Sequence, residues 1–162
     1  MEKLDKAAAL VNELHKHKLS LCTAESCTGG GIADRITDVP GASQVFVGAV
    51  VAYTPEAKSI LLNLPAEDIP PGAVGEKLTV AMAAQAKSLL GTDLALAVTG
   101  ALGPASPAES IGVGQIFISI TGLGQEEVRQ INFAGDRQTI KEAAVNAGID
   151  FLLAYIARWY NA

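Results

Sequence analysis

The sequence predicts an α/β protein whose mixed, mostly parallel sheet of about five strands is covered by helices on both sides. Apolar runs of strand length alternate with segments of helical periodicity along the 162 residues, as in the right-handed crossovers of a parallel sheet. The last two strand-like runs, at 115–120 and 128–133, flank a short glycine-containing turn, so the sheet ends in an antiparallel hairpin. Hydrophobic residues make up 49% of the chain, which is enough for a full core without disulfides.

The first half of the chain alternates helix and strand from its start. Apolar residues recur at helical spacing over residues 3–17, and an apolar run at 19–24 follows as a strand. Residues 28–37 form a helix that ends at an Asp-Val-Pro-Gly breaker. The valine-rich run at 46–53 is a second strand, which we expect to be buried on both faces. A short helix over 55–61 begins at a proline, which is well placed in a first helical turn.

The second half begins with a loop at 63–72 that carries three prolines. Helical periodicity then predicts a helix over 75–90, and a glycine leads from it into a third strand at 94–98. The Gly/Pro/Ser/Ala-rich segment 99–113 is too long for a simple connector, which favours a functional loop. After the hairpin, the final helix covers 136–159.

Charge and cysteine content exclude several classes of protein. The formal charge is −5 and the chain has no cluster of Lys or Arg, which argues against a nucleic-acid or membrane-surface partner. Cys22 and Cys27 are too few for a disulfide framework and have no histidine at metal-binding spacing, so we expect no metal site. The charged N-terminus does not resemble a signal peptide, and no apolar run approaches the ~18 residues that span a bilayer. We therefore expect a cytoplasmic protein with one domain over residues 1–162.

A strand-to-helix turn carries the strongest sign of a reactive site. Residues 24–30 read Ala-Glu-Ser-Cys-Thr-Gly-Gly, which places a serine and a thiol beside backbone N–H groups that can bind an anion. Ser26 is the better nucleophile candidate, because a thiolate at Cys27 needs a nearby histidine and both histidines lie on the first helix. A lysine that acts as the base for Ser26 must be neutral near pH 7, so its pKa must fall by about 3 units from the ordinary value of about 10.4. The candidate bases for Ser26 are Lys58, Glu25 and Tyr53.

The ends of three predicted strands favour a site at one edge of the sheet. Parallel strands direct their carboxyl ends to the same crevice, where such folds bind ligands, and these ends fall here at 25–26, 53–54 and 99–100. Structural interpretations stay open for the same residues. The Ser-Cys-Thr turn is also typical of a helix N-cap. Lys58 can equally be a solvated lysine or one that binds a phosphate, and Tyr53 can serve only for packing at the rim of the crevice.

Further short motifs recur in a fixed order along the chain. They are 24–30 (Ala-Glu-Ser-Cys-Thr-Gly-Gly), 37–43 (Thr-Asp-Val-Pro-Gly-Ala-Ser), 50–53 (Val-Val-Ala-Tyr), 56–58 (Glu-Ala-Lys), 72–74 (Gly-Ala-Val), 97–100 (Ala-Val-Thr-Gly) and 135–137 (Gly-Asp-Arg). Together they closely resemble the CinA C-terminal domain family.

The resemblance implies a three-layer α/β/α fold and nicotinamide-nucleotide amidohydrolase activity. Such enzymes hydrolyse the carboxamide of nicotinamide mononucleotide to nicotinate mononucleotide and ammonia. The resemblance places the nucleophile on Ser26 and its partners on Lys58 and Tyr53, and no metal or organic cofactor is required. We expect the oxyanion to bind N–H groups of the turn at 27–30. The expected substrate-binding residues are Glu25, Cys27, Thr28, Gly29, Gly30, Thr99, Gly100, Gly103 and Arg137.

The loop at 101–112 departs from the family pattern, because the family's glycine cluster and lysine are missing there. If that loop holds the ribosyl phosphate, the chain has lost one cation. Arg137, at the start of the final helix, is then the nearest conspicuous cation for the phosphate. The alternative is that Arg137 pairs with a carboxylate such as Asp136 or Glu109.

Three functions remain open at this stage. The first is a serine amidohydrolase that acts on nicotinamide mononucleotide as its small-molecule substrate. The second is a catalytically impaired paralogue that binds nucleotide. The third is a structural subunit in which alanine-rich helices and a patch of Tyr155, Trp159 and Tyr160 serve assembly. We also expect a homo-oligomer.

Overall fold

The computed structural model describes residues 2–160, which form five α-helices, five β-strands and three short 3-10 turns. Every predicted helix and strand is present, with ends shifted by a few residues. None of the helices in this part of the chain is both long and apolar enough to cross a membrane. The elements are α1 (Glu2–His17), β1 (Leu21–Glu25), α2 (Gly31–Thr37), β2 (Phe46–Val51), α3 (Pro55–Leu62), α4 (Glu76–Leu90), β3 (Leu94–Gly100), β4 (Gln115–Gly122), β5 (Gln125–Asn132) and α5 (Arg137–Trp159).

The five strands form one mixed sheet in the order β2-β1-β3-β4-β5. β1 pairs in parallel with both β2 and β3, whereas β4 pairs antiparallel with both β3 and β5. Only β4 therefore runs against the common direction. The predicted mixed sheet with a terminal antiparallel hairpin is confirmed.

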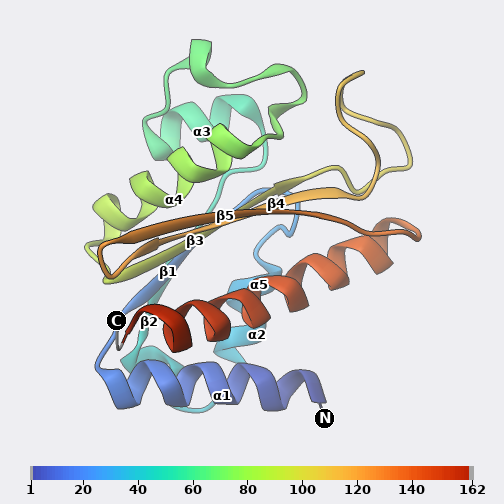
Figure 1. Ribbon diagram of the computed structural model, residues 1–162. Coiled ribbons are helices and arrows are strands. Elements are labelled where there is room, and N and C mark those ends of the chain that lie inside the picture. Colours follow the sequence, from blue (N-terminus) through green and yellow to red (C-terminus); the bar gives the residue numbers. More distant parts are fainter. Residues whose placement is uncertain (1, 161–162) are drawn as a thin grey trace.

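Helices cover the two faces of this sheet unequally. Figure 1 shows α3 and α4 on one side and α1, α2 and α5 on the other, which gives three layers. Strands between such layers are buried on both sides, and β1 and β3 are accordingly buried along almost their whole length.

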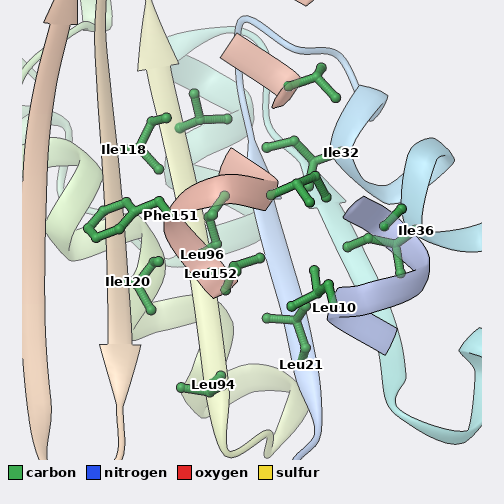
Figure 2. Close-up of a cluster of buried hydrophobic side chains, with 14 of the residues drawn as sticks. Leu10, Leu21, Ile32, Ile36, Leu94, Leu96, Ile118, Ile120, Phe151 and Leu152 are labelled. Atoms are coloured by element: carbon green, nitrogen blue, oxygen red, sulfur yellow. The ribbon is translucent and has the colours of Figure 1, made fainter. Parts of the chain in front are cut away.

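Two different cores result from the alternation of side chains along each strand. On the α1/α2/α5 side, large aliphatic residues of β3 and β4 pack against Phe151 and Leu152 of α5 (Figure 2). On the α4 side, Ala95 and Ala97 of β3 belong to a cluster with Met82 and the small residues Ala83 and Ala86 of the helix. The alanines allow α4 to lie close to the sheet, which explains how a chain with only 5% aromatic residues fills its interior.

The prediction that the second strand is buried on both faces is wrong. β2 is the last strand of the sheet and has a neighbour only on the β1 side. Its residues alternate between intermediate and exposed, with Val47 55% and Val51 43% exposed. A valine-rich run is typical of a buried strand, but it does not reveal where the strand stands in the sheet.

The proposed assembly patch near the C-terminus is exposed only in part, at Tyr160, which is 38% exposed. Tyr155 is only 1% exposed, and its hydroxyl donates a hydrogen bond to the Gly122 carbonyl. The Trp159 indole donates to the Glu127 carboxylate, and Tyr160 stacks on His17. These rings serve the packing of α5 against the sheet and α1.

The last residue of β1, Glu25, ties the sheet to α2. Its carboxylate is fully buried and accepts four hydrogen bonds: from the Thr23 and Thr28 hydroxyls at 3.0 and 2.7 Å, and from the Ile32 and Ala33 N–H groups at 2.8 and 3.0 Å. α2 has a glycine at its N-cap and no side-chain cap of its own. Glu25 therefore caps the N-terminus of α2 and fixes the turn that follows β1.

We expect Glu25→Gln to lower the free energy of unfolding by about 1.5 to 3 kcal/mol, the range for hydrogen bonds to a charged group. The amide turns one accepting oxygen into an NH2 donor that faces other donors. Urea unfolding measures the loss, and Glu109→Gln on the exposed loop is the matched control. Equal stability of Glu25→Gln and the parent protein would contradict this role.

Candidate active site

The three predicted strand ends do meet at one pocket of about 370 Å³. Its wall includes the turn after β1, the residue Tyr53 after β2 and the end of β3, as well as the segment before α4 and the loop after β3. The lining residues are Ser26, Cys27, Tyr53, Pro55, Gly72, Ala73, Val74, Gly100, Ala101, Leu102, Gly103, Ala105, Pro107 and Arg137.

Ser26 and Lys58 are in direct contact at the base of this site. The Lys58 Nζ donates to the Ser26 Oγ at 2.8 Å, and both side chains are buried. Lys58 reaches the serine because α3 begins immediately after β2. Thr54 caps that helix by accepting from the Ala57 N–H, and Pro55 occupies its first turn. The lysine one turn later therefore points back over the end of the sheet.

Two backbone carbonyls orient the Lys58 amine. Besides the serine, Nζ donates to the carbonyls of Ala52 at 2.8 Å and Tyr53 at 3.2 Å. A carbonyl oxygen only accepts, so a neutral amine directs its two N–H groups to these oxygens and its lone pair to the Ser26 hydroxyl. Burial lowers the pKa of Lys58 to about 8. The solvated-lysine interpretation is therefore wrong, and the arrangement suits a general base.

Cys27 is placed for packing. It is buried, and burial is the main cause that raises the pKa of its thiol to about 12, with the Glu25 charge adding to the rise. A thiolate at Cys27 is thus strongly disfavoured near neutral pH. Its sulfur lies 3.3 Å from the point where a Cβ on Gly100 would stand, and the same Cβ would lie 2.2 Å from Ile116. Only glycine fits at position 100.

The turn at 27–30 offers fewer free N–H groups than its length implies. The Gly29 N–H donates to the Ser26 carbonyl at 3.1 Å and closes the turn. Within residues 2–160, the N–H groups of Cys27, Thr28 and Gly30 donate to no backbone carbonyl. Gly29 and Gly30 have φ angles of 59° and 96°, which glycine adopts without strain.

Tyr53 and Arg137 form a second contact at the pocket wall. The Arg137 guanidinium donates to the Tyr53 hydroxyl at 2.8 Å and to the Gly103 carbonyl at 2.7 Å. No hydrogen bond or ion pair joins Arg137 to Asp136 or Glu109 within the described residues. Asp136 instead caps α5 by accepting from the Thr139 N–H. Lys58 contacts Tyr53 through the backbone carbonyl, so the phenol faces a different part of the pocket.

Several predicted binding residues support the wall from behind instead of lining it. Glu25 and Thr28 bond each other, and the Thr99 hydroxyl lies 2.8 Å from that of Thr79 and accepts from the Gly75 N–H. None of these three predicted residues lines the pocket, and neither do Gly29 and Gly30.

Sequence reasoning missed two parts of the site. The Ala52 carbonyl binds Lys58, but a backbone group leaves no signal in the side-chain pattern. The wall at 72–74 also lines the pocket. The Gly-Ala-Val run there was visible in the sequence, but its place in the same pocket as Ser26 depends on how the loop before α4 folds.

Comparison with known proteins agrees with this architecture. The CinA C-terminal domain matches residues 3–156. A CinA-like protein of Citrifermentans bemidjiense is 39% identical over 156 residues, which cover 96% of this chain and 37% of that protein. A putative competence-damage inducible protein of Bacillus velezensis is 38% identical over 150 residues, covering 90% of this chain and 36% of the relative. The chain thus spans little more than a third of these curated relatives.

Solved structures of similar size match the whole fold. A CinA superfamily protein from Klebsiella pneumoniae 700603 superposes with a TM-score of 0.93 at 27% identity, over 98% of this chain and 100% of that chain. A competence/damage-inducible protein from Agrobacterium tumefaciens gives a TM-score of 0.90 at 29% identity, over 95% of each chain. Matches of this extent in sequence and in structure establish the relationship: the chain belongs to the CinA C-terminal domain family.

Proposed function

We propose that residues 1–162 act as a single amidohydrolase domain that hydrolyses the carboxamide of nicotinamide mononucleotide. The observation that carries this proposal is the buried 2.8 Å contact between Lys58 Nζ and Ser26 Oγ beside a pocket of about 370 Å³. That volume lies near the lower end of the usual 300–1,000 Å³ for ligand pockets, which suits a mononucleotide. Family membership supports the choice of substrate.

Acyl transfer through Ser26 accounts for the reaction. Ser26 Oγ attacks the carboxamide carbon while its proton passes to neutral Lys58. The proton passes from Lys58 to the leaving nitrogen, the C–N bond of the tetrahedral intermediate breaks, and ammonia departs to leave a seryl ester. Water then attacks the ester and gives a proton to Lys58. Nicotinate mononucleotide is released, and Ser26 recovers its proton. This route requires no metal or organic cofactor.

The N–H groups that directly follow Ser26 are suited to the oxyanion. Cys27 and Thr28 directly follow the nucleophile, and their N–H groups donate to no backbone carbonyl within the described chain. Loss of one oxyanion donor typically costs about 3 kcal/mol of transition-state stabilisation. Because Gly29 is occupied within the turn, it supports this site by its conformation and not as a donor.

Arg137 is suited to the ribosyl phosphate. It is the one charged side chain among the residues that line the pocket. Its present partners, a carbonyl and a phenol, are neutral, so a phosphate would compete with them for a full charge–charge contact.

The scarcity of cations also favours a second candidate, a domain that binds a nucleotide and turns it over slowly or not at all. Ammonia release from nicotinamide mononucleotide, measured with the purified protein, separates the two. Catalytic release supports the amidohydrolase. Tight binding of the nucleotide without release would support the binding module.

Ser26→Ala should reduce ammonia release by more than about a thousandfold, because it removes the nucleophile. Cys27→Ala is the matched control and should keep most of the activity. Circular dichroism would verify that both variants fold. An inactive Cys27→Ala together with an active Ser26→Ala would reverse the assignment.

Lys58 should limit the reaction through its protonation state. Activity should rise with pH and level off above a pKa of about 8, because the neutral amine is the base. Lys58→Arg keeps the charge but cannot lose a proton, so kcat should fall by at least about a hundredfold. Lys77→Arg on the surface of α4 is the control. A Lys58→Arg enzyme that changes only KM would show a binding role.

Arg137→Ala should lower kcat/KM for the mononucleotide by an amount that corresponds to about 1.5 to 3 kcal/mol, the value of a hydrogen bond to a charged group. Since Arg137 also bonds Tyr53, the riboside without phosphate serves as the second substrate. Any loss through Tyr53 affects both substrates alike, whereas a phosphate contact affects only the nucleotide. Arg158→Ala, at the other end of α5, is the control. Equal losses for the two substrates would exclude Arg137 from phosphate binding.

A further inference from the structure

We propose that the Tyr53 hydroxyl serves the phosphate end of the pocket: it positions the Arg137 guanidinium and takes no part in the proton transfer from Ser26. The family resemblance makes Tyr53 a partner of the nucleophile and its base, so this inference gives the phenol a different task. It rests on the function proposed above, because it takes the anion at Arg137 to be the phosphate of a nucleotide.

The Lys58 amine has no position left for the phenol. Besides its own carbon, a lysine nitrogen has three further positions, which hold hydrogens or a lone pair. They are directed here to the Ser26 hydroxyl at 2.8 Å and to the carbonyls of Ala52 and Tyr53 at 2.8 and 3.2 Å. A phenol that exchanged a proton with this amine would have to displace one of these partners. Tyr53 therefore reaches the base through its backbone, which leaves its side chain for another task.

The phenol contacts Arg137 instead. Its hydroxyl accepts from the guanidinium at 2.8 Å, and within residues 2–160 no hydrogen bond joins it to Ser26 or Lys58. Tyr53 is 55% exposed, whereas Ser26 is 7% and Lys58 0% exposed. The phenol thus lies closer to solvent than the reacting pair does. This position suits a strongly hydrated phosphate, while the carboxamide enters the buried end of the pocket.

Two contacts hold the guanidinium in one orientation. The Gly103 carbonyl accepts from Nη1 at 2.7 Å and the Tyr53 hydroxyl accepts from Nη2 at 2.8 Å. A guanidinium has five N–H donors in a planar fork, so these two bonds leave three for an anion. Holding a side chain with many rotamers in place before the ligand arrives removes part of the entropic cost of binding. The hydroxyl of Tyr53 therefore contributes to phosphate affinity through Arg137.

Tyr53→Phe separates the two roles because it removes only the hydroxyl. The carbonyl that holds Lys58 belongs to the backbone, so the base keeps its partners in this variant. A change that displaced Tyr53 as a whole would also move this carbonyl and would slow every substrate. Loss of the hydroxyl alone should act only where Arg137 acts, which is on the phosphate.

Kinetics and binding with two ligands test this assignment. For nicotinamide mononucleotide, Tyr53→Phe should raise KM about tenfold, the size of one lost hydrogen bond to a charged group. The Kd measured by calorimetry should rise about as much when Tyr53→Phe is combined with Ser26→Ala, which prevents turnover. The kcat should fall by less than about threefold, because the phosphate contact is the same in the ground state and the transition state.

The riboside without phosphate should show no more than about a twofold change in kcat/KM or in Kd. Tyr160→Phe is the matched control, because that ring stacks on His17 and does not line the pocket. It should alter neither ligand.

A double-mutant cycle shows whether the hydroxyl acts through Arg137. In an Arg137→Ala background, Tyr53→Phe should weaken the nucleotide by less than about twofold, since no guanidinium is left to position. A full tenfold loss in that background would overturn the proposal. An unchanged nucleotide affinity of Tyr53→Phe without the second substitution would overturn it as well.

The same data separate this role from a proton relay and from the proposed reaction. A fall in kcat of about a hundredfold or more with both substrates is the size of a general acid–base role and would overturn the proposal. A parent protein that binds the nucleotide but releases no ammonia would refute the reaction alone, because the affinities of Tyr53→Phe and Arg137→Ala still test the phosphate contact. A parent protein that binds the riboside as tightly as the nucleotide would refute the contact itself.

Discussion

The burial of the Lys58 amine at the end of the sheet is the constraint on which the site depends. A charged amine loses its hydration there and finds only a hydroxyl and two carbonyls as partners. The pKa of Lys58 consequently falls to about 8, below its value of about 10.4 in an unfolded chain. Its burial therefore opposes folding below about pH 8, where the amine is charged in both states, and this cost diminishes as the pH rises toward 10.4. The fold carries that cost at a position where a neutral lysine can take a proton from Ser26.

Rigid elements on both sides keep this pair in register. β1 lies between β2 and β3, and its last residue, Glu25, anchors α2 through four hydrogen bonds. The turn that carries Ser26 is thus held at its start by the sheet and at its end by α2. On the other side, the Thr54 cap fixes the start of α3, so the position of Lys58 follows from the end of β2. The contact between Ser26 and Lys58 joins two separate strand-to-helix connections that meet at one edge of the sheet.

Local patterns in the sequence were sufficient to predict these two connections but not their surroundings. The apolar run before Ser26 and the proline before Lys58 marked each strand end, and the parallel topology implied that the ends meet. The order of strands is set by tertiary packing, so the exposed edge position of β2 was not visible in its valine-rich sequence. Contacts made by backbone carbonyls, such as Lys58 with Ala52 and Arg137 with Gly103, likewise depend on loop geometry. Glu25 is a further example: the sequence predicts that it faces the substrate, whereas its buried carboxylate holds the turn through hydrogen bonds to α2.

The central claim is that Lys58 loses its proton near neutral pH because it is buried against Ser26. The most direct measurement is an NMR titration of the Lys58 side chain, followed through its 13Cε resonance in the intact protein and assigned with Lys58→Arg. We expect a pKa of about 8 for this group, well below the ordinary lysine value of about 10.4. A Lys58 pKa at the ordinary lysine value of about 10.4 would contradict the account, because the amine would then be charged near neutral pH and unable to activate the serine.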